Sequence, residues 1–221
     1  MICFVGDSHA AIHLRQGAEA RGVKTVPYPN LASLIFVSED TPTDENGVRN
    51  VEPIRALVRR MSAYNVPIVL TSQVPPGFTR SLELKNIWHQ AETLRIKDAG
   101  FRAVNPDYIA VGGEVPIPPV YADYLLAFGC PILRMSWEDA EMTKIAVNMM
   151  LAAQVDYANR LSAAAARFGA DWQQVCRALH LDKRIGPEAY LTPGRWQDSK
   201  HLLRDWHTLQ GLTTEEAAST S

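Results

Sequence analysis

The sequence predicts an α/β fold, with a layered domain built on a parallel sheet, then a long helix and a small helical region. Two observations predict it. Short apolar runs alternate with helical segments through the first half, and the second half opens on a helical run of about 33 residues, well beyond the mean length. The 221 residues are 47% apolar and 21% charged, as in globular proteins. A formal net charge of −2 excludes a strongly basic surface for nucleic acid or anionic lipid.

The first half supplies the strands. Residues 2–5 are an apolar run that ends at Gly6, which predicts a buried strand, and the alanine-rich segment 10–21 predicts a helix closed by Gly22. Further strands are predicted at 23–26, 34–38, 67–71 and 101–104, and further helices at 51–63 and in the polar stretch to about residue 97. Parallel sheets bind ligands at the carboxyl ends of their strands, which fall at 7–9, 39–43, 72–77 and 105–107.

The second half is helical. Ser136 and Asp139 form a capping box that opens a helix to Phe168, and Asp171 caps another helix to about residue 179. So long an apolar helix must bury more than one face, and packing on a second copy would do so. We therefore expect a homodimer through the helix 136–168. The expected organisation is an α/β domain at 1–135, a helical dimerisation and substrate region at 136–212, and a disordered tail at 213–221.

The cysteine pattern and the N-terminal residues indicate in which cellular compartment the protein is expected. Cys3, Cys130 and Cys176 are odd in number, widely spaced and set in apolar stretches, so buried thiols are expected rather than disulfides or zinc ligands. No signal peptide precedes Gly6, and no apolar run approaches the roughly 20 residues of a membrane helix. The default expectation is a cytoplasmic protein.

The strand–turn–helix at 6–11 has the position of a dinucleotide-binding turn but departs from its glycine pattern. Only Gly6 is kept, because Ser8 and Ala11 stand where two further glycines belong. The second strand runs into Pro27-Tyr-Pro29, where an acid should hold the ribose. The sequence therefore predicts that NAD is not bound, although the helix N-terminus could bind another phosphate.

The same turn has a second interpretation. Gly6-Asp-Ser8 resembles the nucleophile block of the GDSL/SGNH esterases, and Asp198-x-x-His201 resembles their closing motif. Their Gly-x-Asn-Asp block is missing, and a helix N-cap at Asp7 or Ser8 explains the turn more simply.

A wider resemblance covers most of the chain in order. The matching segments are Thr-Pro-Thr-Asp-Glu-Asn-Gly at 41–47, Ser-Gln-Val-Pro-Pro-Gly at 72–77, Asn-Pro-Asp-Tyr at 105–108, Ala-Glu-Met-Thr-Lys-Ile-Ala-Val-Asn at 140–148, and Arg-Ile-Gly at 184–186 followed by Tyr190 and Pro193-Gly194. Together they resemble a truncated, divergent member of the UDP-glucose/GDP-mannose dehydrogenase family. The resemblance implies a Rossmann-like first domain, a long dimerising helix and a nucleotide-sugar site.

Two residues of the long helix carry the implied chemistry. In the family, a lysine and an asparagine at this spacing act on the sugar and bind a catalytic water, and Lys144 and Asn148 match them. Alternatively, Lys144 pairs with Glu141 on a solvated face. The family also oxidises its sugar twice through a cysteine, whereas the corresponding loop here continues as 195–201 without one. No thiol is therefore available for the second oxidation, and a counterpart of the C-terminal nucleotide-binding domain is missing.

The kept and missing features predict an NAD-independent enzyme acting on a UDP- or GDP-sugar, best described as a metal-assisted isomerase or pyranose–furanose mutase. The alternatives are a nucleotide-sugar dehydrogenase with altered cofactor binding, or a non-catalytic nucleotide-sugar-binding relic. The predicted catalytic residues are Lys144, Asn148, Asp107, Arg80 and His9. The predicted substrate-binding residues are Ser8, Thr41, Ser72, Gln73, Asn105, Arg184, Arg195 and Lys200. Asp7, Asp198 and His201 are predicted ligands for Mg²⁺ or Mn²⁺.

Overall fold

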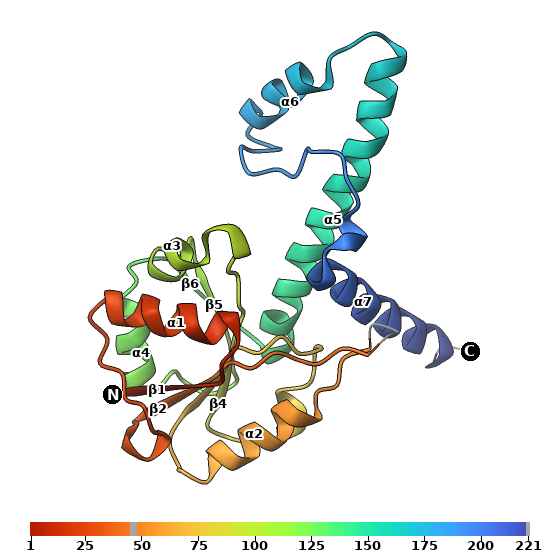
Figure 1. Ribbon diagram of the computed structural model, residues 1–221. Helices are drawn as coiled ribbons and strands as arrows, with labels where there is room; N and C mark the ends of the chain where they lie inside the picture. Colours follow the sequence, from red (N-terminus) through yellow and green to blue (C-terminus); the bar gives the residue numbers. More distant parts are fainter. Residues whose placement is uncertain (45–47, 220–221) are drawn as a thin grey trace. The chain divides into compact units, whose positions relative to one another are not determined.

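A computed structural model describes residues 1–44 and 48–219, and the side chains of residues 1–44 and 48–211 (Figure 1). The chain divides into two units. The first comprises Met1–Asp44 and Arg49–Lys144, and the second Glu45–Val48 and Ile145–Ser221. Among the described residues, no helix is long and apolar enough to cross a membrane.

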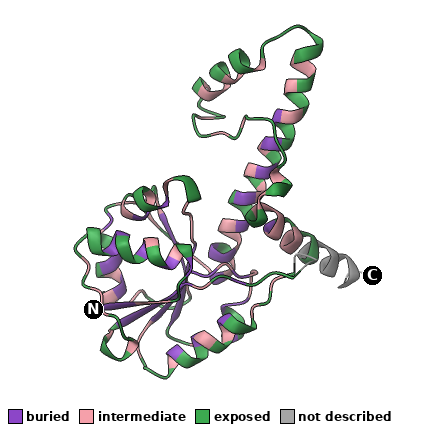
Figure 2. Ribbon diagram, in the orientation of Figure 1, coloured by how far each residue is buried: buried purple, intermediate pink, exposed green. Residues whose placement is uncertain are grey.

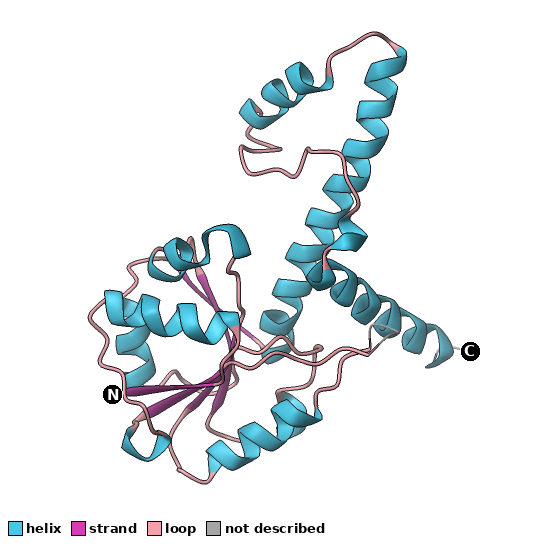
Figure 3. Ribbon diagram, in the orientation of Figure 1, coloured by secondary structure: helices cyan, strands magenta, loops and turns pink. Residues whose placement is uncertain are grey.

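The first unit is built on a six-stranded sheet. Its strands are β1 (Ile2–Val5), β2 (Leu34–Val37), β3 (Ile68–Leu70), β4 (Ile87–Gln90), β5 (Ile109–Gly112) and β6 (Ile132–Met135), and they lie side by side in this order. The first four strands are parallel, β5 is antiparallel to β4, and β6 is parallel to β5. The predicted α/β, Rossmann-like fold is confirmed, with one reversal in an otherwise parallel sheet. Figure 3 shows the strands of this sheet with helices around them.

Helices cover both faces of the sheet. They are α1 (His9–Ala20), α2 (Glu52–Ser62), α3 (Ala99–Val104) and α4 (Pro119–Leu126), together with the beginning of α5 (Trp137–Arg167). Alternate residues of β2 enter different cores: Ile35 packs with α2 and the start of α5, and Phe36 packs with α1 and α4. All four residues of β2 are buried, so this strand lies at the centre of the unit (Figure 2).

Three element predictions are wrong. The segment 23–26 forms only the isolated bridge between Ile2 and Thr25, since Pro27 cannot continue a ladder. The segment 101–104 belongs to helix α3, in which Ala99 and Ala103 are buried one turn apart while Phe101 is 68% exposed. That burial follows a helical period, which four apolar-rich residues alone do not reveal.

The third correction concerns the polar helix predicted to about residue 97. The stretch instead contains the short 3-10 helices η2 (Arg80–Leu82) and η3 (Ile96–Asp98), with strand β4 between them. All four residues of β4 are buried, including the polar His89 and Gln90. Polar side chains in a buried strand conceal the strand pattern in the sequence.

The second unit is helical. It contains α5 from Ile145 onward, α6 (Trp172–Leu181), the 3-10 helix η4 (Trp196–Asp198) and α7 (Lys200–Ser219). The capping box that opens α5 is present: Asp139 N–H donates to Ser136 Oγ (3.1 Å), and Ser136 N–H to Asp139 Oδ2 (3.2 Å). The predicted disordered tail at 213–221 overlaps the end of α7. Its side chains, like residues 220–221, lie outside the described part and that prediction stays untested.

Candidate functional site

Four strand ends meet at one edge of the sheet in the first unit. Strands β1 to β4 are parallel, so the residues that follow Val5, Val37, Leu70 and Gln90 lie along the same edge. One hydrogen bond ties two of these ends together, from Glu39 N–H to Ser72 Oγ (2.8 Å). The carboxyl edge of such a sheet is where α/β proteins bind their ligands.

An ion pair marks this edge. Lys144 Nζ lies 3.3 Å from Glu92 Oε2, and each side chain is only 14% exposed. Lys144 comes from α5, and Glu92 follows β4 by two residues. The other carboxylate oxygen of Glu92 accepts a hydrogen bond from Leu94 N–H, which fixes the orientation of the pair. A poorly hydrated ammonium beside a carboxylate can bind a hydroxyl and exchange a proton with it.

Glu92 is a site residue that sequence reasoning missed. The resemblance puts the acid of the family segment at Asp107, whose side chain is 72% exposed and pairs with Arg102. The tetrapeptide Gln-Ala-Glu-Thr at 90–93 has an acid in third place, as Asn-Pro-Asp-Tyr at 105–108 does. Its position directly after a strand would have identified it, but the predicted polar helix concealed strand β4.

The alternative pairing of Lys144 with Glu141 is not formed. Glu141 is 2% exposed and accepts backbone hydrogen bonds from Gly77 (2.6 Å) and Thr79 (2.7 Å). Burial raises the pKa of this carboxyl, against the opposing effect of those bonds. Glu141 therefore anchors the loop after β3, while Lys144, one turn later, is left to Glu92.

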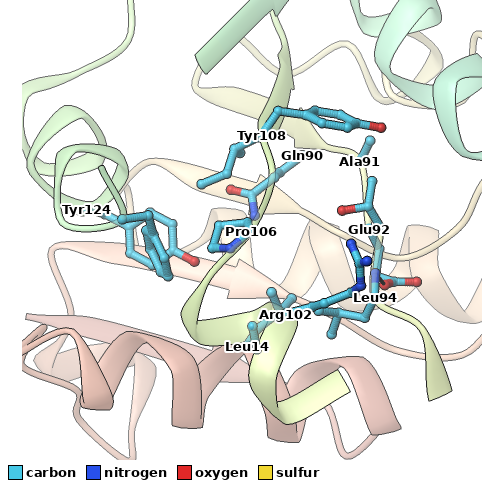
Figure 4. Close-up of a pocket in the computed structure, with 13 residues that line it drawn as sticks. Leu14, Gln90, Ala91, Glu92, Leu94, Arg102, Pro106, Tyr108 and Tyr124 are labelled. Atoms are coloured by element: carbon cyan, nitrogen blue, oxygen red, sulfur yellow. Dashed lines mark hydrogen bonds between the residues drawn. The ribbon is translucent and has the colours of Figure 1, made fainter. Parts of the chain in front are cut away.

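A small cavity adjoins Glu92 (Figure 4). It has a volume of about 30 Å³ and is lined by residues that include Gln90, Glu92, Arg102 and Tyr108. This is about the space of one water molecule. A nucleotide sugar cannot enter it, but a water there would lie next to the Glu92 side of the ion pair.

Three predicted substrate-binding residues hold two loops together. Thr41 and Ser72 are buried, and Thr41 Oγ1 donates to the carbonyl of Gln73 (3.2 Å). Arg49, which the sequence did not single out, donates to the same carbonyl (3.1 Å). Residues 45–47 of the matching segment lie outside the described residues. The loops after β2 and β3 therefore form one cross-linked wall at the sheet edge.

Arg80 and Asn105 are engaged locally. The Arg80 guanidinium pairs with Glu138 (2.6 Å) and Glu114 and lies over the Trp137 ring at 5.1 Å. Its hydrogen bonds lower the pKa of Glu138. Asn105 accepts a hydrogen bond from Arg21 (2.9 Å). The roles predicted for these residues in catalysis and binding remain predictions.

The Gly6 turn departs from a dinucleotide cradle in more than its sequence. Ser8 is the N-cap of α1: its Oγ accepts from Ala11 N–H (3.1 Å) and donates to the Ser38 carbonyl (2.8 Å). His9 turns towards His13, with the two Nε2 atoms 3.1 Å apart. A Cβ built on Gly6 would meet Glu39 Oε2 at 3.0 Å, so a carboxylate occupies the approach to the turn. These residues do not fit a diphosphate.

The predicted metal ligands do not form a group. Asp7 belongs to the first unit, whereas Asp198 and His201 belong to the second. Asp198 lies 3.5 Å from the Arg195 guanidinium, and both side chains are over 70% exposed. Across the described residues, no cluster of three or more histidines, cysteines, aspartates or glutamates could hold a metal. Nothing here supports the predicted Mg²⁺ or Mn²⁺.

In the second unit, the amide of Asn148 is committed to Asp205, which is fully buried on α7. The loop between α6 and α7 is tied to α5 by three polar side chains. Gln154 accepts from Tyr190 N–H (2.8 Å), Asp156 from Trp196 Nε1 (2.9 Å), and Asn159 exchanges two bonds of 2.8 Å with the backbone of Gly194.

The cations predicted to bind substrate are exposed in this unit. Arg184 pairs with Asp182 (2.7 Å) and is 87% exposed. Arg195 is also exposed, and Lys200 is the first residue of α7. Their assignment to substrate remains a prediction.

Comparison with known proteins shows that the chain is similar to nucleotide-sugar dehydrogenases. Residues 138–220 match the model of the central domain of the UDP-glucose/GDP-mannose dehydrogenase family. UDP-glucose 6-dehydrogenase 2 of Arabidopsis thaliana is 30% identical over 188 residues, which cover 71% of this chain and 38% of the relative. The UDP-glucose 6-dehydrogenase YwqF of Bacillus subtilis is 26% identical over 177 residues, covering 71% and 39%. The chain thus spans about 40% of the length of these curated relatives.

Solved structures share the fold. A UDP-glucose dehydrogenase from Pyrobaculum islandicum has a TM-score of 0.70 at 20% identity, over 95% of this chain and 67% of that one. A GDP-mannose dehydrogenase from Pseudomonas aeruginosa has a TM-score of 0.71 at 18% identity, over 87% and 59%.

Proposed function

We propose, from the premise that this chain is a divergent relative of the UDP-glucose/GDP-mannose dehydrogenase family, that it binds a UDP- or GDP-sugar through a site of the dehydrogenase type. The single observation that carries this proposal is the Lys144–Glu92 pair, 3.3 Å apart at the carboxyl edge of the sheet. Lys144 lies in the helix that matches the family's central domain.

The pair is suited to a sugar hydroxyl. The ammonium of Lys144 can donate to the hydroxyl oxygen, and the carboxylate of Glu92 can accept the hydroxyl proton. Both groups are largely removed from water, so their interaction with a bound polar group is stronger than at the surface. Glu92 thus takes the place of Asp107 beside Lys144 among the proposed catalytic residues. Asn148, one helical turn from Lys144, stays a proposed catalytic residue.

The reaction is proposed to be that of a dehydrogenase-type site with altered cofactor binding. A hydride acceptor such as NAD would supply oxidation where it binds, but the Gly6 turn does not fit its diphosphate. The metal-assisted isomerase or mutase has no support among the described residues, since they contain no metal-binding cluster. A homodimer through 136–168 remains part of the proposal.

Calorimetry tests the binding. The wild-type chain is titrated with UDP-glucose and GDP-mannose, with UDP and GDP as controls that lack the hexose. Lys144→Met and Glu92→Gln are expected to weaken binding of the sugar nucleotide at least tenfold, because each removes a charge-assisted hydrogen bond of about 1.5–3 kcal/mol. Lys85→Met, at an exposed lysine, should leave the affinity unchanged.

Two further readouts separate the possible reactions. Formation of NADH in the presence of NAD would show oxidation, and new sugar resonances in NMR spectra without NAD would show isomerisation. We expect no dependence of binding on added Mn²⁺ or EDTA. The proposal fails if neither nucleotide sugar binds the wild-type chain, or if both bind Lys144→Met equally well.

A further inference from the structure

A carboxylate stands over the glycine of the first turn. Gly6 has a φ of +117°, in the region that favours glycine. A side chain there would lie 2.1 Å from the Ser38 carbonyl oxygen and 3.0 Å from Glu39 Oε2. Gly6 has the place of the first glycine of a dinucleotide-binding turn, which makes the tight turn next to the diphosphate, and Ser8 has the place of the second, which lets the backbone approach it. Here the end of β2 and its glutamate lie against that turn.

A second carboxylate adds to the charge. Burial raises the pKa of Glu39, and the neighbouring Asp7 raises it further, against backbone hydrogen bonds from Asp40 and Asp7 that lower it. Asp7 directly follows Gly6, the residue against which Glu39 Oε2 lies, so both acids belong to the same turn. Two carboxylates beside each other repel a diphosphate, whose charge has the same sign.

The helix N-terminus has one donor fewer for an anion, because the N–H of Ala11 is already bonded to Ser8 Oγ. The adenosine side is also altered: the strand that would carry a ribose-binding acid is reduced to the bridge at Thr25, and Thr25 Oγ1 donates to Glu19 (2.7 Å).

We infer that Glu39, together with Asp7, is a specificity determinant that excludes nucleoside diphosphates from the Gly6 turn. The consequence is that a dinucleotide cannot bind this chain in the usual Rossmann crevice. The inference does not depend on the nucleotide-sugar site, because it concerns a different pair of residues.

The test uses ADP and NAD as probes with the full chain. Calorimetry is performed on the wild type, on Glu39→Gln, and on Asp7→Asn/Glu39→Gln. The control is Glu52→Gln/Asp123→Asn, which removes the same net charge at exposed positions away from the turn. Circular dichroism confirms that each variant is folded.

The expected result is no saturable binding of ADP or NAD to the wild type or the control. The double variant should bind ADP at least tenfold more tightly than the wild type, with an affinity that falls as salt is added. Glu39→Gln should show an intermediate gain. Saturable binding of NAD to the wild type, an equal gain in the control, or no gain in either turn variant overturns the inference.

Titrations of nucleotide sugars into the same protein preparations distinguish a failure of this inference from a failure of the proposed function. UDP-glucose and GDP-mannose are titrated into Asp7→Asn/Glu39→Gln as well. Loss of sugar-nucleotide binding in Lys144→Met concerns the ion pair alone, whereas a change in ADP binding concerns the turn alone.

Discussion

The carboxylate of Glu141 accepts a hydrogen bond from the backbone N–H of Thr79, at 2.7 Å, and a second from Gly77 at 2.6 Å. Glu141 lies on the first turns of α5, and the two N–H groups belong to the loop after β3. A buried side chain of the helix thus holds the loop that leads to Arg80. Thr41 and Arg49 hold the same loop at the Gln73 carbonyl, so Glu141 fixes the end of the loop that is nearer to Arg80.

Glu141→Gln is expected to lower the free energy of unfolding by about 1–3 kcal/mol. The amide presents only one oxygen, and its NH₂ group faces a backbone donor, so one buried N–H loses its acceptor. Urea titrations followed by tryptophan fluorescence measure the change. Glu138→Gln on the same helix is the matched control and should cost less, because that carboxylate is more exposed. Equal effects of the two substitutions would contradict the anchoring role.

Two glycines between α1 and α3 are expected to respond in opposite directions to alanine. A Cβ on Gly17 would lie 2.3 Å from the Ala103 carbonyl oxygen, whereas one on Gly100 would have its first contact at 3.7 Å, with His13. Gly17→Ala should destabilise by about 1–3 kcal/mol through overpacking. Gly100→Ala should stabilise by up to about 1 kcal/mol through helix propensity. Thermal unfolding of both variants beside the wild type checks the signs. A loss in both would contradict the predicted gain at Gly100, and no loss in Gly17→Ala would show that the helices adjust.

The structure predictions that succeed rest on interactions between residues close together in the sequence. Those that fail depend on contacts with segments distant in the chain. The helix at 137–167 follows from a local signal, because Ser136 and Asp139 cap each other across three residues. Strand β4 has no such signal, since His89 and Gln90 are polar and are buried by elements distant in the chain. Likewise, whether the segment 23–26 forms a full strand or a single bridge depends on its pairing with β1, which is distant in the chain.

The residues of the candidate site also differ in whether the sequence alone could identify them. Lys144 could be identified from the resemblance of the segment 140–148 to a family motif, because that motif lies within one helix. Glu92 could not be paired with it, because their contact requires α5 to pass the end of β4, and the strand itself was not predicted. Glu39 could be placed at a strand end, but its position over Gly6 is a matter of side-chain packing that no sequence pattern records.

The contribution of the capping box formed by Ser136 and Asp139 to the free energy of unfolding can be measured. Ser136→Ala should destabilise by about 1 kcal/mol, because Asp139 N–H loses its acceptor at the start of α5. Ser136→Thr should retain most of the stability, since its hydroxyl can occupy the same place. The free energy of unfolding from urea titrations compares the two. No difference between alanine and threonine would mean that water replaces the cap.

Acid is expected to destabilise the protein through His89. Burial lowers the pKa of His89 to about 3 in the folded protein, from an ordinary value of 6.5. Above about pH 6.5 both the folded and unfolded states hold it neutral. As the pH falls below that value, only the unfolded state takes up the proton, so stability decreases by at most about 1.4 kcal/mol per pH unit towards pH 3.

His89→Leu should flatten this dependence between about pH 6.5 and pH 4. Urea titrations at several pH values, for the variant and the wild type, measure the slopes. His9→Gln, at an exposed histidine, is the control and should leave the contribution of His89 in place. A wild-type slope unchanged by His89→Leu would assign the acid sensitivity to other groups.

The Lys144–Glu92 pair should appear as a coupling energy in a double-mutant cycle. Lys144→Met leaves a largely buried carboxylate without its cation, and Glu92→Gln leaves the ammonium without its anion, so each should destabilise on the order of 2 kcal/mol. The double variant should lose less than the sum, since it leaves neither charge unpaired. Unfolding free energies of the four proteins give the coupling. Strict additivity would show that the two side chains do not interact, and would also remove the observation on which the nucleotide-sugar site rests.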